Sequence, residues 1–183
     1  MSKNVVICGF ARSPSTPANR GQLAKVRPDD LTAEVVKGLI KNNSINIDDV
    51  EDLILGCAFP EGEQGMNLAR NVVFLSGLPH SVGGVTVNRF CASSMQAIHQ
   101  AAGAIISGSG ELFIAGGVES MSRVPMAGFN PMLNPSLIDM DAYIGMGYTA
   151  ENLAKKHSIS RAKQEEMALA SHQKAAKAKD EGS

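Results

Sequence analysis

The stretch that decides the fold is Ser81-Val-Gly-Gly-Val-Thr-Val-Asn88, followed after two residues by Cys91-Ala-Ser-Ser-Met-Gln-Ala-Ile-His-Gln-Ala-Ala-Gly-Ala-Ile-Ile-Ser107. The first part is short, rich in β-branched residues and opened by glycines, a pattern that predicts a strand. In the second part apolar residues recur at helical spacing: Met95, Ile98, Ala102 and Ile105. The sequence therefore predicts a strand that passes almost directly into a helix, with Cys91 at the joint.

Cys91 is the candidate nucleophile. A cysteine in the first turn of a helix lies at the positive end of the helix dipole, beside main-chain N–H groups that no helical carbonyl uses. This placement favours the thiolate, the nucleophilic form of cysteine. The N–H groups, that of Cys91 included, can stabilise an oxyanion on a carbonyl that the sulfur attacks. The alternative is a structural thiol, because free cysteines are often part of the core.

Strand and helix patterns alternate on both sides of this stretch. Strands are expected at residues 5–8, 52–59, 81–88 and 111–117. Helices are expected from Pro28, over residues 67–76 and over residues 91–107. Four strands separated by helices predict an α/β domain with a mainly parallel sheet that is covered on both faces.

The pattern changes after Glu119. Residues 120–148 are rich in Met, Pro, Gly and Asn and show no regular period, and a long irregular segment of this kind is usually functional. Ser160 is expected to cap a charged helix that runs to about Lys179. We therefore expect a first domain over residues 1–121 and the beginning of a second over 122–183.

The helix expected over residues 91–107 has no Asp, Glu, Lys or Arg, and it carries a second stripe of small residues, Ala97, Ala101 and Ala104. A helix that is apolar on several sides is usually buried on several sides. One sheet can cover only one of them. We therefore expect a further layer that these residues do not provide, or that another chain provides.

Composition excludes several classes of protein. A net charge of −1 with 44% hydrophobic residues indicates a globular protein without general attraction to nucleic acid or anionic membranes. Three widely separated cysteines predict neither a disulfide framework nor a metal cluster, and they favour a reducing compartment, the cytoplasm. We expect no secretory signal in the first ten residues and no membrane span.

Four segments, in order and over nearly the whole chain, together resemble the thiolase family. Val87-Asn-Arg-Phe-Cys-Ala-Ser-Ser94 is similar to the nucleophile segment of that family, and Ala115-Gly-Gly-Val-Glu-Ser-Met-Ser122 to the end of its fourth strand. Gly145-Met-Gly-Tyr-Thr-Ala-Glu-Asn-Leu-Ala154 resembles the part of its loop region that contacts coenzyme A. Residues 158–174 are similar to the helix that follows.

The resemblance implies a thiolase-type βαβαβαβ domain followed by the start of an inserted loop domain. It implies that Cys91 attacks the C3 carbonyl of a 3-oxoacyl-CoA, that acetyl-CoA leaves, and that coenzyme A takes the shortened acyl group from the sulfur. The reverse reaction is a Claisen condensation to acetoacetyl-CoA. Met146 is implied to contact coenzyme A, which is a substrate, with no permanently bound cofactor and no metal. The full-length enzyme is implied to be a homo-oligomer.

The chain also departs from the family. Family members are much longer, and their second half carries a histidine that activates the nucleophile and a second cysteine that moves the proton at C2. No histidine here matches the first, neither Cys8 nor Cys57 matches the second, and the strand that closes the first domain is missing. The chain alone is therefore expected to have little or no thiolase activity. Gly145, where some biosynthetic members carry His, favours a degradative, fatty-acid thiolase.

Three alternatives remain open at this point. One is a 3-oxoacyl synthase of the same superfamily, whose cysteine motif differs from Asn88-Arg-Phe-Cys-Ala-Ser93. Another is a non-catalytic remnant, or a subunit of a split thiolase, that kept the fold. The last is a thiol redox sensor built on a parallel sheet.

Overall fold

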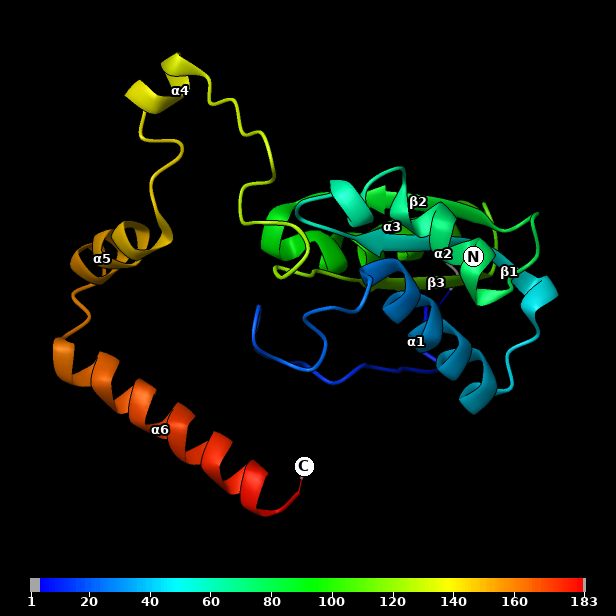
Figure 1. The fold of residues 1–183 in the computed structure, drawn as a ribbon, viewed down its shortest axis with the longest axis horizontal. Helices are drawn as coiled ribbons and strands as arrows, with labels where there is room; N and C mark the ends of the chain where they lie inside the picture. Colours follow the sequence, from blue (N-terminus) through cyan, green and yellow to red (C-terminus); the bar gives the residue numbers. More distant parts are fainter. Residues whose placement is uncertain (1–3, 183) are drawn as a thin grey trace. The chain divides into compact units, whose positions relative to one another are not determined.

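The computed structural model describes residues 4–182, which form two compact units that divide between Pro131 and Met132. Figure 1 shows the ribbon, coloured along the chain. Within the described residues, the first unit contains the sheet, and the regular elements of the second are helices joined by irregular segments. The domain division expected from the sequence, 1–121 and 122–183, stays a prediction.

The sheet of the first unit has three parallel strands, β1 (Val50–Gly56), β2 (Gly83–Val87) and β3 (Leu112–Gly117), in the order β2-β1-β3. β1 lies in the centre, and its residues from Leu53 to Gly56 are all buried. The helices between successive strands carry the chain back so that all three run in the same direction. The α/β class, the parallel sheet and three of the four expected strands are therefore confirmed.

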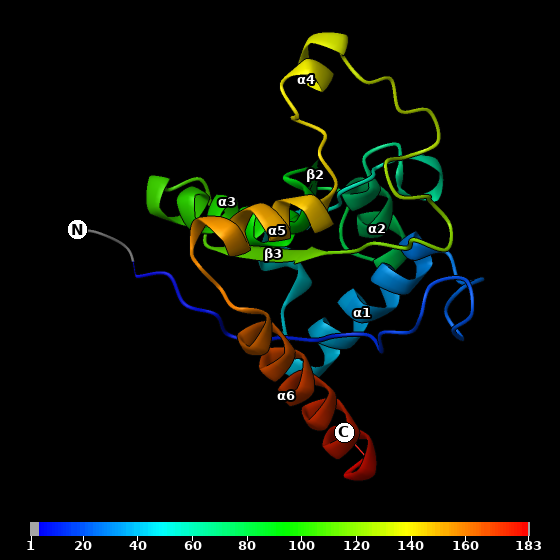
Figure 2. The ribbon, with the colours of Figure 1, turned by 90° about the vertical axis from the view of Figure 1, so that its left-hand side faces the viewer.

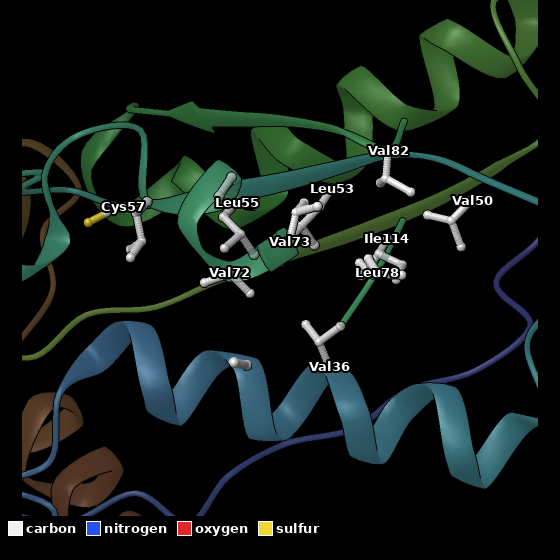
Figure 3. Packing of buried hydrophobic residues seen from close by; sticks show 13 residues of the cluster. Val36, Val50, Leu53, Leu55, Cys57, Val72, Val73, Leu78, Val82 and Ile114 are labelled. Atoms are coloured by element: carbon white, nitrogen blue, oxygen red, sulfur yellow. The ribbon is translucent and has the colours of Figure 1, made fainter. Parts of the chain in front are cut away.

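Helices cover both faces of this sheet. α1 (Pro28–Asn43) and α2 (Leu68–Ser76) lie on one face, and α3 (Ser93–Ser107) lies on the other (Figure 2). Alternate side chains of β1 point to opposite faces, as the strand period requires: Leu53 and Leu55 join the cluster with α1 and α2, and Ile54 joins Ala97 and Ala101 of α3. Figure 3 shows the first of these clusters.

Short turns complete the first unit. From residue 4 onward it has three single-turn 3₁₀ helices: η1 (Ile47–Asp49), η2 (Gly62–Gln64) and η3 (Phe90–Ala92). Gly77 and Gly108 end α2 and α3 with φ angles of 76° and 82°, left-handed values that glycine adopts without a steric cost. These caps turn the chain back toward the next strand.

The strand expected over residues 5–8 is not formed. This segment has no regular structure, and Val6 and Ile7 are 76% and 81% exposed. Residues 4–11 line one side of a cavity of about 500 Å³, and β3 lines another side. Because this space separates the two main chains, residues 5–8 have no neighbour to pair with. A strand needs such a neighbour whatever its side chains are.

α3 is shorter than expected and packs on its small residues. The predicted helix began at Cys91, whereas α3 begins at Ser93 and the turn η3 precedes it. Ala97 and Ala101 are buried against the sheet, while Met95 and Ile98 are 55% and 40% exposed. The small side chains let the helix lie close to the strands. The expected cover for the other side of α3 stays a prediction.

The second unit consists of α4 (Pro135–Asp139), α5 (Met146–Lys156) and α6 (Arg161–Asp180). The hydroxyl of Ser160 accepts a hydrogen bond of 3.3 Å from the N–H of Lys163, which confirms the expected N-cap. None of the residues 132–182 is buried. Nowhere in residues 4–182 does a helix have the length and apolar character needed to cross a membrane.

Candidate active site

Cys91 lies between β2 and α3, in the turn η3, at the edge of the sheet where the parallel strands end. Its thiol is free and exposed. The ring of Phe90 lies beside that of Phe59, with centroids 6.1 Å apart, so the turn also contacts the segment that follows β1. The sequence-based placement of Cys91 between a strand and a helix is confirmed. Its expected position in the first turn of that helix is wrong, because Cys91 lies in η3, two residues before α3 begins.

Glycines at the ends of two strands make this joint possible. A side-chain carbon added at Gly56, the last residue of β1, would collide with the main chain of Ser93 and Ser94. One added at Gly117, the last residue of β3, would collide with the hydroxyl of Ser94. The first turn of α3 therefore lies directly against the ends of β1 and β3, and only glycine leaves room for it.

Side chains on both sides of Cys91 hold the turn in an uncommon backbone conformation. Phe90 has a φ of 47°, a left-handed value that costs a bulky residue about 1–3 kcal/mol. The Oδ1 atom of Asn88 accepts a hydrogen bond of 2.8 Å from the N–H of Phe90. The hydroxyl of Ser93 accepts from the N–H of Arg89 at 2.8 Å and donates to the carbonyl of Phe90 at 2.6 Å. The turn is therefore fixed on each side of the cysteine.

The main-chain N–H of Cys91 is available for another partner. The next N–H, that of Ala92, donates to the carbonyl of Arg89 at 3.0 Å, whereas no hydrogen bond within residues 4–182 uses the N–H of Cys91. An exposed sulfur next to an unused main-chain donor can attack a carbonyl carbon and stabilise the oxygen that becomes negative. Acyl transfer through a thioester uses such a pair of groups.

A second polar cluster lies at the same edge of the sheet. The carboxylate of Glu119 accepts hydrogen bonds from the N–H groups of Ala58 and Phe59, at 2.7 and 3.3 Å, and from the Nε2 atom of Gln64 at 2.9 Å. Burial, with a further contribution from the negative charge of Glu119, raises the pKa of Cys57 to about 12. Cys57 therefore stays protonated near neutral pH and is not a nucleophile.

Sequence reasoning missed the polar residues that shape this edge: Gln64, Asn88, Ser93 and Glu119. Gln64 is completely buried although it ends the single turn η2 in a segment rich in glycine and charge, and nothing local signals this burial. Asn88 gave a usable signal, because an Asn that follows a strand often accepts a hydrogen bond from the N–H two residues later.

Met146, the expected contact with coenzyme A, is the first residue of α5 in the second unit and is 71% exposed. Its role stays a prediction. Within residues 4–182 no group of three or more His, Cys, Asp or Glu side chains is placed to hold a metal ion.

Comparisons with known proteins place this geometry in a family. The family model described as "Thiolase, N-terminal domain" matches residues 5–183. The 3-ketoacyl-CoA thiolase of Bacillus subtilis is 48% identical over 98% of this chain and 46% of its own length. That of Aliivibrio fischeri is 47% identical over 98% of this chain and 47% of its own length.

A solved structure agrees with these relatives. The crystal structure of the Bacillus anthracis acetyl-CoA acetyltransferase superposes with a TM-score of 0.83 at 34% identity, over 99% of this chain and 49% of that one. The chain thus spans about half the length of the relatives that it matches. The match covers both units and includes the strand-to-helix joint, and the chain therefore belongs to the thiolase family, of which it carries the N-terminal domain.

Proposed function

We propose that this chain supplies the nucleophile of a thiolase that transfers an acyl group between Cys91 and coenzyme A. The observation that carries the proposal is the exposed Cys91 thiol at the strand-to-helix joint, next to its own unused N–H. The names of the relatives support a 3-oxoacyl-CoA as substrate. The cysteine motif, which differs from that of the 3-oxoacyl synthases, supports the same choice.

The steps follow from ordinary thioester chemistry. The Cys91 thiolate forms a bond to C3 of the substrate, and the C3 oxygen takes the electron pair and is stabilised by the N–H of Cys91. When the carbonyl forms again, the C2–C3 bond breaks and C2 takes a proton, which releases acetyl-CoA. The thiol of coenzyme A then displaces the acyl group and regenerates Cys91. An oxyanion donor of this type contributes about 10²–10³ in kcat.

We further propose that the base for Cys91 and the group that moves the C2 proton are not among these 183 residues. The high pKa of the buried Cys57 supports this for one of the two other cysteines. The chain alone would then cleave 3-oxoacyl-CoA slowly or not at all. A split thiolase, in which another chain provides these groups, is the second candidate, and the unreactive Cys57 supports it equally.

The remaining features of the proposal concern ligands and location. Coenzyme A is a substrate that Met146 helps to bind, and no cofactor is permanently held. Gly145 favours degradation of fatty acids over synthesis of acetoacetyl-CoA. The wide separation of the three cysteines supports a reducing compartment such as the cytoplasm. A homo-oligomeric state stays a prediction from the family resemblance.

Intact-mass measurement tests the proposal. The chain is incubated with acetyl-CoA and the modified peptide is then identified, with Cys91→Ala and Cys8→Ala as variants, because both thiols are exposed. We expect one acetyl group on Cys91, its loss in Cys91→Ala and its retention in Cys8→Ala. Because the base for Cys91 is proposed to lie elsewhere, the reaction is expected to be slow, and the preference for Cys91 over Cys8 is the readout. Acetylation no more frequent on Cys91 than on Cys8 would leave a non-catalytic member of the fold as the better conclusion.

A further inference from the structure

The turn that carries Cys91 is linked by side chains to the segments that follow the other two strands. The carboxylate of Glu119, two residues after β3, accepts from the N–H of Ala58, two residues after β1, at 2.7 Å. The carbonyl of Ala58 accepts from the Nδ2 atom of Asn88 at 2.8 Å, and the Oδ1 atom of Asn88 accepts from the N–H of Phe90 at 2.8 Å. We call this series, Glu119–Ala58–Asn88–Phe90, the edge chain.

The edge chain begins where the hydrogen bonds of the sheet end. The last main-chain hydrogen bond between the ends of β1 and β2 runs from the N–H of Cys57 to the carbonyl of Val87, at 3.0 Å. Beyond it, the amide group of Asn88 connects the two segments, with its donor on one and its acceptor on the other. Because Phe90 has a left-handed φ, the turn needs such a tether to keep that conformation.

Glu119 is itself held from its other side. Gln64, which is fully buried, donates from Nε2 to Glu119 at 2.9 Å and to the carbonyl of Phe59 at 2.8 Å, and its Oε1 accepts from the N–H of Ser120 at 2.5 Å. A carboxylate fixed by a buried amide is a defined anchor for the segment after β1. An anchor at Glu119 and a tether at Asn88 together determine where Phe90, and hence the next residue, lies.

We infer that Glu119 and Asn88 are positioning residues for Cys91, acting through the edge chain rather than by contact with the substrate. The inference rests on the proposed function, since it concerns the same sulfur. It assigns Glu119 a role that depends on Asn88: the carboxylate affects Cys91 only while the Asn88 amide donates to Ala58. This dependence separates positioning from a general contribution to stability.

The test is a double-mutant cycle on thiol reactivity in the 183-residue chain. The rate of alkylation by iodoacetamide is measured for each cysteine by peptide mass spectrometry. Exposed Cys8 serves as an internal reference, and a cooperative thermal unfolding transition reports that each variant is folded. Glu119→Gln removes one of the oxygens that accept main-chain N–H groups, and Asn88→Asp keeps the acceptor for Phe90 but loses the donor to Ala58.

Two matched controls are available. Glu61 accepts from the N–H of Phe129 at 2.7 Å, the same contact outside the edge chain, so Glu61→Gln repeats the chemical change. Asn134 accepts from the N–H of Ser136 at 2.9 Å, the same local turn in the second unit, so Asn134→Asp controls for Asn88→Asp. Both controls are expected to leave the ratio of the Cys91 rate to the Cys8 rate unchanged.

We expect Glu119→Gln and Asn88→Asp each to change that ratio by about two- to tenfold, and Glu119→Gln to have no further effect in the Asn88→Asp background. Equal effects of Glu119→Gln in both backgrounds, or an effect no larger than that of Glu61→Gln, would overturn the inference. Neither result bears on acetylation of wild-type Cys91, which tests the proposed function separately.

Discussion

Replacing Gly56 by alanine should destabilise the first unit and distort the joint that carries Cys91. The new side-chain carbon would lie against the main chain of Ser93 and Ser94, and 2.7 Å from the carbonyl oxygen of Ser93. Main-chain atoms cannot rotate away as a side chain does, so β1 and α3 must separate. Overpacking of this kind costs about 1–3 kcal/mol, and we expect the upper end of that range.

The expected cost can be measured by thermal unfolding. For a unit of this size, about 3 kcal/mol lowers the melting temperature by roughly 10 °C. Gly103→Ala is the matched control, because Gly103 lies in the same α3 helix with nothing within 4 Å of an added carbon. That change should stabilise the helix by about 0.5–1 kcal/mol and raise the melting temperature.

A lower melting temperature in Gly56→Ala and a higher one in Gly103→Ala would show that the cost arises where the end of β1 contacts α3. If Gly56→Ala and wild type melted together, the close approach of α3 to the end of β1 would be refuted. If the melting temperature of Gly103→Ala fell as well, the loss of stability would instead be a general effect of replacing glycine by alanine in this chain.

The remaining predictions concern titratable groups. In native protein near neutral pH we expect Ellman's reagent to titrate only the two exposed thiols, and all three after denaturation, because burial raises the pKa of Cys57 to about 12; three fast thiols in the native state would contradict this. The hydrogen bond from Arg123 lowers the pKa of Glu63, so the stability that this carboxylate contributes is complete above its usual value of 4.5 and is lost as the pH falls through its folded value. Urea unfolding should therefore show Glu63→Gln weakening the protein at pH 7 and losing that effect in acid; an equal difference at both pH values would be contrary evidence. Burial raises the pKa of Asp52, whose Oδ1 atom has no hydrogen-bond partner, so Asp52 opposes folding increasingly as the pH rises above 3.8. Asp52→Asn should gain stability relative to wild type between pH 3 and pH 7, and a constant difference over that range would exclude this cause.

Local sequence patterns were sufficient for the elements whose partners lie in the same unit. The β-branched run that became β2 and the apolar run that became β1 each have a neighbouring strand and helices on both faces. Val5-Val-Ile-Cys8 has an equally good strand pattern but no strand beside it. A pattern describes the faces of a strand, and it does not say whether a hydrogen-bonding partner is present.

In the candidate site, too, local sequence patterns predicted some features and not others. Cys91 could be predicted because a strand, a short turn and a helix follow one another in the sequence. The contacts that Asn88 and Ser93 make within the turn are local, two to four residues apart. The anchor at Glu119 bonds Ala58, 61 positions away, so no local pattern contains it. The two apolar stripes of α3 did not indicate which one packs on the sheet, and close approach to the sheet favours Ala97 and Ala101 over the larger Met95 and Ile98.

The cavity between residues 4–11 and β3 has a practical consequence for handling the protein. Within residues 4–182, β3 is paired only with β1, so the peptide groups of its other edge are left to water or to a foreign strand. Such an edge is a template for aggregation. Yield and shelf life in solution should therefore depend on whether a strand pairs with the free edge of β3. While residues 5–8 remain unpaired, the amide hydrogens of Val6 and Ile7 should exchange rapidly with deuterium.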